Sequence, residues 1–176
     1  MQGICDHNMV LLNVVAKWQG STHDSFILQS SGIPDQFESG TFGTGWLLGD
    51  SGYSLKEWLL TPMAEPSTPQ HRNYNVIHRK TRCLIERTFG LLKSRWRILD
   101  HTGGSLCYTP QRVSKIIMTC CVLHNICRRN GTPILGPNSP IAQLINNDDI
   151  ESGSANTTSG IRQRERVADL MWSTSR

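Results

Sequence analysis

Apolar and β-branched residues near the N-terminus form two runs separated by a polar cluster. The runs occupy residues 3–5 and 10–18, and Asp6, His7 and Asn8 lie between them. Extended runs of this kind favour strands, and a short cluster of turn-forming residues favours a tight reversal. The pattern therefore predicts a β-hairpin at the start of the chain.

A short helix is predicted next, in the segment STHDSFILQSSG. Its apolar residues are residues 26–28, and Ser21 or Thr22 is expected to cap its N-terminus with a side-chain oxygen. We expect the helix to stop at Gly32, because Pro34 follows and proline cannot continue the hydrogen-bonded ladder of a helix interior.

Two brief apolar runs, residues 46–48 and 58–60, predict short strands. The first run leads into the sequence GDSG, so Asp50 lies where a strand exits into a turn. Side chains at strand ends of α/β sheets commonly contact ligands. Three prolines within residues 62–69 predict a loop without regular structure before the next element.

A long helix is predicted from about Asn73. Apolar residues recur there every three or four positions, as expected for one buried helix face. This stripe comprises Ile77, Thr81, Ile85, Phe89, Leu92 and Trp96. A second face carries Glu86 together with Arg79, Arg82, Gly90, Lys93 and Arg97.

The second half of the chain predicts two further helices and a linker. One helix opens at Pro110 and runs to about Asn130, where Gly131 follows. Residues 131–160 are rich in Gly, Pro, Ser, Thr and Asn, which predicts a flexible linker. Residues 161–172 are expected to form a terminal helix.

The six cysteines form no C-x-x-C pair, and we expect them to be reduced in an intracellular compartment. Neither a leader segment nor a run of roughly 20 apolar residues is recognisable. Cys120, His124 and Cys127 share one helix face, which fits either a zinc site or a buried apolar stripe. Val113, Ile116, Ile117 and Leu123 extend that face and favour the stripe.

Positive charge is concentrated in one segment. The 176 residues carry a net charge of +4, yet eight of the eighteen Lys and Arg residues lie between Arg72 and Arg97, where Glu86 is the one acid. Such a segment favours a polyanionic partner such as nucleic acid. Glu86 is then either an ion-pair partner of nearby arginines or a ligand of a divalent cation shared with phosphates.

Three acids differ from the others by their context. Asp24 begins a short helix, Asp50 follows a strand, and Glu86 lies on the basic helix. Carboxylates that meet at a sheet edge can hold the metal ions of a phosphodiester-cleaving centre. The alternatives are a favourable helix N-terminal position for Asp24 and an ordinary turn position for Asp50.

Four segments now identify a family resemblance. In chain order they are NVVAKWQGSTHDSFIL, WLLGDSGYSLKEWLLTP, YNVIHRKTRCLIERTFGLLKSRWRIL and TCCVLHNI. From about residue 2 to residue 131 the chain resembles the endonuclease domain of PIF/Harbinger transposases and their animal nuclease derivatives. The resemblance implies an RNase H-like α/β fold, a mixed sheet flanked by helices, and metal-dependent cleavage of DNA with Mg²⁺ or Mn²⁺.

The resemblance also implies roles for individual residues. Asp50 corresponds to the second acid of the family's metal-binding triad and Glu86 to the third, so both are expected to be catalytic. Asp24 is a further acid expected to approach the metal. The cations expected to bind DNA phosphates are Arg79, Lys80, Arg82, Lys93, Arg95 and Arg97.

The sequence departs from the family at its start. The family's first triad acid lies on a strand upstream of the hairpin, and Asp6 does not take its place. We therefore expect an N-terminally truncated endonuclease domain over residues 1–131, lacking the first strand of its sheet. Residues 132–176 are expected to form a flexible tail with the terminal helix.

Two functions stay open at this point. The chain is either a metal-dependent endonuclease or a catalytically inactive module that binds DNA or protein. The function and the cationic stretch predict a nuclear location, with the cytoplasm as a second compartment. The resemblance further implies a separate Myb-like DNA-binding partner. The lack of a long apolar run predicts no membrane association.

Overall fold

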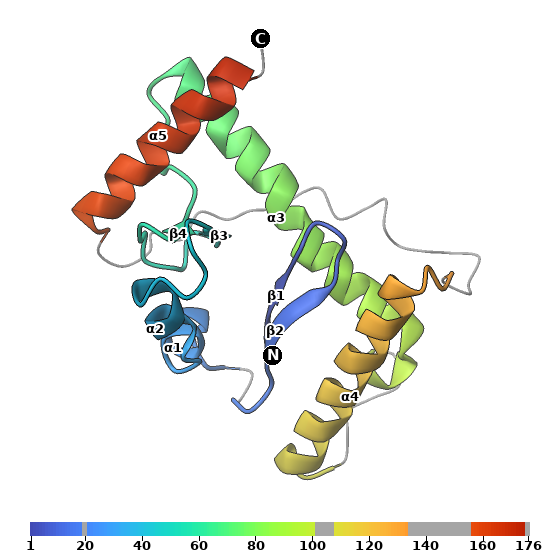
Figure 1. Ribbon diagram of the computed structural model, residues 1–176. Coiled ribbons are helices and arrows are strands. Elements are labelled where there is room, and N and C mark those ends of the chain that lie inside the picture. Colours follow the sequence, from blue (N-terminus) through green and yellow to red (C-terminus); the bar gives the residue numbers. More distant parts are fainter. Residues whose placement is uncertain (19–20, 101–107, 134–155, 175–176) are drawn as a thin grey trace. The chain divides into compact units, whose positions relative to one another are not determined.

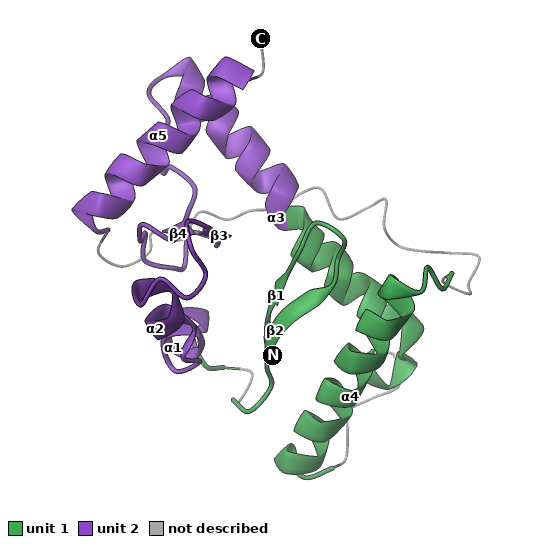
Figure 2. Cartoon of the chain, viewed as in Figure 1, with its two compact units in different colours: residues 1–22, 83–146 green, residues 23–82, 147–176 purple. Residues whose placement is uncertain are grey.

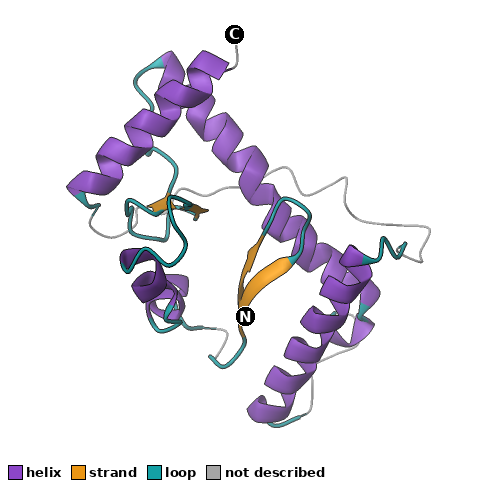
Figure 3. Ribbon diagram, in the orientation of Figure 1, coloured by secondary structure: helices purple, strands orange, loops and turns teal. Residues whose placement is uncertain are grey.

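The chain forms two compact units (Figure 1). The computed structural model describes residues 1–18, 21–100, 108–133 and 156–174. Unit 1 draws on residues 1–22 and 83–146, and unit 2 on residues 23–82 and 147–176, as coloured in Figure 2. The described residues form helices and two small sheets joined by loops (Figure 3), so the protein is of the mixed α and β class.

Unit 1 begins with the predicted hairpin. Strands β1 (Gln2–Cys5) and β2 (Leu11–Val15) pair antiparallel, with an irregularity between Ile4 and Cys5. The Asp6 carboxylate closes the turn, because its Oδ1 accepts the backbone N–H groups of Asn8 and Val10, each at 2.9 Å. Asp6 is therefore a turn residue, as the sequence indicated.

Two helices cover this hairpin within unit 1. They are the C-terminal part of α3 (Pro69–Arg95) and α4 (Pro110–Arg129). The buried centre consists of Leu11, Leu92, Cys120 and Cys121, with Ile85, Phe89, Trp96, Ile116 and Ile117 among the residues packed against it. Gly3 lies under the Phe89 ring, where a Cβ atom would come within 3.1 Å of the ring.

The buried face of α4 is the predicted stripe except at Leu123. Ile116, Ile117, Cys120 and His124 lie inside as expected, but Leu123 is 42% exposed. His124 is held inside by a hydrogen bond of 2.9 Å from its Nε2 to the Met9 carbonyl. Since no group of three or more metal-ligating side chains occurs among the described residues, the zinc alternative has no support there.

Unit 2 opens with two short helices, of which the sequence predicted one. Helix α1 (Asp24–Gln29) begins after His23, which makes no side-chain cap bond, so the expected capping by Ser21 or Thr22 is wrong. Helix α2 (Ile33–Glu38) was not predicted. Pro34 lies in its first turn, where the missing N–H of proline costs nothing.

The sheet of unit 2 consists of β3 (Leu47–Leu48) and β4 (Leu59–Leu60), which run parallel. The following loop is shorter than expected, because α3 starts at Pro69 instead of near Asn73, again with proline in the first turn. Since each described sheet has two strands, the RNase H-like arrangement and its missing strand stay predictions.

The first half of α3 buries a different face from the one predicted. Thr81 is exposed, whereas Tyr74 and His78 are buried. Their polar atoms bond to carbonyls at the end of β4: Tyr74 Oη to Thr61 at 3.0 Å and His78 Nε2 to Leu60 at 3.2 Å. These two hydrogen bonds, and not the apolar spacing alone, therefore determine which face of the first half of α3 is buried.

The predicted terminal helix is present as α5 (Thr158–Thr174), which begins three residues earlier than expected. Its Val167 and Ala168 complete a buried cluster with Leu55, Leu60, Met63 and Tyr74. Residues 134–155, the greater part of the predicted linker, lie outside the described residues. None of the helices in the described ranges is long and apolar enough to cross a membrane.

The buried His124 predicts a pH dependence of stability. Burial lowers its pKa below the ordinary value of 6.5, and the charges of Arg95 and Arg128 act in the same direction, against the bond to Met9. The unfolded chain therefore binds more protons than the folded chain below about that pH, so stability falls as the pH falls through 6.5. We expect the melting temperature to decrease between pH 7.5 and pH 5.

His124→Gln should flatten that decrease, as measured by thermal melts across the pH series. His7, exposed in the hairpin turn, provides the matched control. His7→Gln should leave the slope unchanged. Equal slopes for the unaltered protein and His124→Gln would show that His124 is not the titrating group.

Candidate active site

Asp50 is held in a tight turn directly after β3. Its Oδ1 accepts the Gly52 N–H at 3.0 Å, and its backbone carbonyl accepts the Tyr53 N–H at 3.3 Å. The preceding Gly49 is buried, and a Cβ atom there would lie 2.9 Å from the Tyr53 ring, so a larger residue would force that ring to move. Asp50 therefore follows a strand end, as predicted, and its carboxylate has a fixed orientation.

Asp24 lies close enough to Asp50 for the two charges to interact. The pKa of Asp24 is raised, first by partial burial of its carboxylate and then by the negative charge of Asp50. A helix N-terminus alone would stabilise the carboxylate and lower its pKa. Burial is thus the main reason for the raised pKa, the charge of Asp50 adds to it, and the roles of both aspartates in a metal site stay predictions.

Glu86 lies on α3 in unit 1, whereas Asp24 and Asp50 belong to unit 2. Its side chain is half-buried, next along the helix to Ile85, which packs in the core of unit 1. Its role as the third acid of the site, and with it the catalytic assignment, stays a prediction.

The two aspartates fit part of a divalent-cation site. Hard cations select carboxylate oxygens, and a cation relieves the repulsion between neighbouring carboxylates. Asp50 uses one oxygen for Gly52, and an ionised carboxylate offers about four lone-pair positions. Within the described ranges, however, no three His, Cys, Asp or Glu side chains gather to form a complete ligand set.

The predicted phosphate-binding cations differ in exposure. Arg79, Lys80 and Lys93 on α3 are exposed. Arg95 is half-buried and donates from Nη2 to the Thr132 carbonyl at 2.9 Å, so it also serves the fold of unit 1. Among the remaining two, Arg82 is half-buried on α3 and Arg97 is exposed just past its end, 3.9 Å from Asp100.

The chain belongs to the DDE superfamily endonucleases, whose family profile matches residues 1–125. Within that superfamily its relatives are of the Harbinger-derived type, which confirms the resemblance read from the sequence. Proteins called "Putative nuclease HARBI1" from Bos taurus and Homo sapiens are each 44% identical to it over 139 residues. "Protein ALP1-like" from Arabidopsis thaliana is 32% identical over 140 residues.

These relatives are considerably longer than the chain. The match covers 76% of this chain but 40% of each mammalian relative, and 72% of this chain but 34% of the Arabidopsis protein. No solved structure matches the chain.

The interaction between Asp24 and Asp50 can be tested by titration. Asp50→Asn removes the neighbouring charge, so the pKa of Asp24 should fall toward its ordinary value of 3.8, while burial keeps it somewhat above. The measurement is a pH titration of side-chain carboxyl signals by NMR. Asp35→Asn, which changes an exposed acid of α2, should leave the Asp24 pKa unchanged.

The raised pKa of Asp24 also affects the stability of the protein. With a raised folded-state pKa, ionisation of Asp24 opposes folding above that pKa and ceases to do so as the pH falls through it. Asp24→Asn should therefore raise the melting temperature slightly at pH 7 and lose that gain below about pH 3.8. The gain is small because Asp24 is largely exposed and solvent screens its charge. A lower melting temperature of Asp24→Asn at pH 7 would contradict the raised pKa of Asp24.

Proposed function

We propose that the chain carries acidic ligands and a DNA-binding face of an endonuclease that hydrolyses phosphodiester bonds with a divalent cation, Mg²⁺ or Mn²⁺. The observation that carries the proposal is the turn after β3 that orients the Asp50 carboxylate, in a chain that belongs to the DDE superfamily endonucleases. The negative charge of Asp50 also reaches Asp24. Two crowded carboxylates destabilise one another, and a divalent cation would reverse that penalty.

The protein's residues would have distinct tasks in this reaction. Asp50 and Asp24 present oxygens to the cation, and the Gly52 N–H keeps the Asp50 carboxylate oriented. Glu86 is the third acid by the family resemblance. A bound divalent cation supplies an activated water and stabilises charge on the attacking and leaving oxygens.

The cationic side chains of α3 would bind the DNA backbone. Lys and Arg contacts to phosphates give affinity without reading the base sequence. Sequence recognition would then come from a separate Myb-like DNA-binding partner, and the protein would act in the nucleus. The alternative, a binding module without catalysis, rests on the basic side chains alone. The names of the mammalian relatives, which describe nucleases, favour the enzyme.

Plasmid nicking tests the catalytic proposal. With Mg²⁺ or Mn²⁺, the full chain should nick supercoiled DNA, and Asp50→Asn or Glu86→Gln should reduce the rate by about 100-fold or more, since the loss of even an outer partner of a metal ligand costs about 10- to 100-fold. Glu57→Gln changes an exposed acid between β3 and β4 and should retain the rate. Equal nicking by Glu86→Gln would point to a contaminant and contradict the proposal.

The salt dependence of DNA binding tests the basic face. Replacing both Arg79 and Lys80 with Ala removes two exposed cations of α3, so the slope of log affinity against log salt should become shallower by roughly 2, at about 0.9 per phosphate contact. Changing Arg162 and Arg166, exposed cations of α5, alters the net charge equally and should leave the slope nearly unchanged. Equal effects of both pairs would mean that α3 is not the binding face.

A further inference from the structure

Helix α5 lies beyond the residues that the family profile matches, and yet it is built into unit 2. The profile ends at residue 125, whereas α5 begins at Thr158. Val167 and Ala168 of α5 are buried against residues that precede and follow β4. Hydrogen bonds from α5, and from Asn156 and Thr157 just before it, reach two places on the segment that carries Asp50.

The first contact place is Leu55, five residues after Asp50. The Leu55 N–H donates to Asn156 Oδ1 at 3.3 Å. The Leu55 carbonyl accepts the backbone N–H of Thr157 at 3.2 Å and its hydroxyl at 3.0 Å. Both backbone groups of Leu55 are therefore bonded to Asn156 and Thr157, the two residues just before α5.

Gly160 brings the helix backbone against the same place. It is buried, and a Cβ atom there would lie 2.9 Å from the carbonyl carbon of Lys56 and 3.1 Å from Cγ of Leu55. A backbone atom cannot move aside as a flexible side chain can. Glycine is thus required for α5 to approach the segment this closely.

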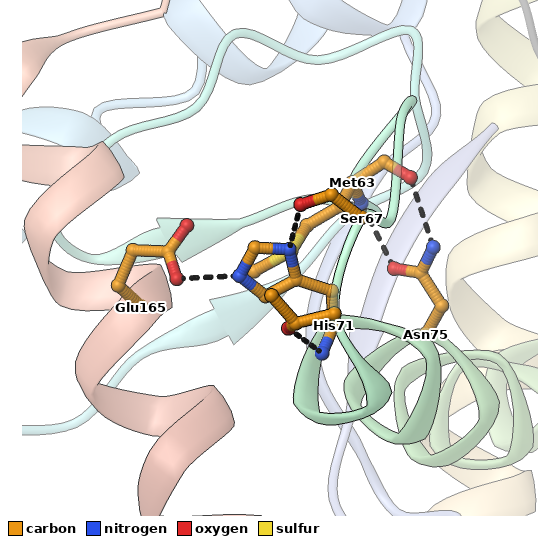
Figure 4. Close-up of polar contacts among 6 residues, drawn as sticks. Met63, Ser67, His71, Asn75 and Glu165 are labelled. Carbon is orange, nitrogen blue, oxygen red and sulfur yellow. Dashed lines mark hydrogen bonds and ion pairs between the residues drawn. The ribbon is translucent and has the colours of Figure 1, made fainter.

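The second contact place is the end of β4. Arg164 of α5 donates from Nη1 to the Pro62 carbonyl at 3.0 Å and to the Thr61 carbonyl at 3.5 Å. Next to it, Glu165 pairs with Nε2 of His71 at 2.8 Å, and Nδ1 of His71 lies 3.3 Å from Ser67 Oγ (Figure 4). These bonds tie α5 to β4 and to the start of α3.

Asp50 lies between the two contact places. The turn of Asp50 leads along the chain to Leu55. On the other side of Asp50, the Gly49 N–H donates to the Leu60 carbonyl at 2.9 Å, one residue before Thr61. We infer that α5 is a positioning element of the acidic site: by holding Leu55 and the end of β4, it fixes the segment that orients the Asp50 carboxylate. This inference rests on the function proposed above.

A positioning role goes beyond stability, because groups that orient a metal ligand affect affinity even when the fold persists. Gly160→Ala in the full chain is the direct test. Alanine is a better helix former than glycine, so α5 itself is not weakened and any loss comes from its docking. Ser159→Ala, at the exposed neighbouring position, is the matched control.

Two readouts are needed. Amide hydrogen exchange at Gly52 and Leu55 should become about 10-fold faster in Gly160→Ala, with exchange at Leu11 in unit 1 unchanged. Mn²⁺ affinity, followed by the electron paramagnetic resonance signal of free Mn²⁺, should fall about 10-fold. Ser159→Ala should match the unaltered protein in both.

If Gly160→Ala fails to fold, two milder variants at Thr157 test the inference instead. Thr157→Val removes the hydroxyl that bonds Leu55 and should weaken Mn²⁺ binding, while Thr157→Ser retains the hydroxyl and should restore it. Unchanged amide exchange in these variants would overturn the inference. Faster exchange with unchanged Mn²⁺ affinity would also overturn it, because it would show a merely structural role for α5. If the unaltered protein bound no Mn²⁺, the proposed function would fail, and the positioning inference would fail with it. The exchange data would still show whether α5 holds the segment.

Discussion

Two-stranded sheets cannot satisfy their own backbone, and this constraint determines how the helices of each unit are oriented. The edge groups of the strands and adjoining loops need polar partners, since an unsatisfied buried donor or acceptor costs about 1–3 kcal/mol. Helical side chains supply these partners. Asn125 bonds both backbone groups of Leu11 at 2.8 Å, and Asn75 bonds both backbone groups of Met63 at 2.9 and 2.8 Å. His124 and His78 serve the carbonyls of Met9 and Leu60 in the same way.

This constraint explains which parts of the fold could be predicted from the sequence. The hairpin, the two short strands, α1, α4 and α5 follow from apolar pattern and turn residues, and the structure has all of them. The predicted faces of α3 and α4 were partly wrong. On α3 the apolar stripe omitted Tyr74 and His78, which are buried, and on α4 it included Leu123, which is exposed. His78 is buried because its Nε2 donates to the Leu60 carbonyl. Pro34 and Pro69 were taken as helix breakers, although both lie in the first turn of a helix.

For the candidate site, context singled out Asp24, Asp50 and Glu86. Asp50 follows a strand end as predicted, and its charge reaches Asp24, while the roles of all three acids stay predictions. The contribution of α5 could not be foreseen, because Asn156, Thr157 and Gly160 have the composition of a linker. Only the contacts with Leu55 and Lys56 reveal that Gly160 is required for close packing.

The central claim is the proposal that Asp24 and Asp50 of unit 2 contribute oxygens to one divalent-cation site. Paramagnetic broadening by substoichiometric Mn²⁺ tests it most directly, read from the backbone amide signals that follow the two acids, Ser25 and Ser51. The account predicts that both signals broaden together, and that excess Mg²⁺ restores them together. Broadening of one signal without the other would contradict it.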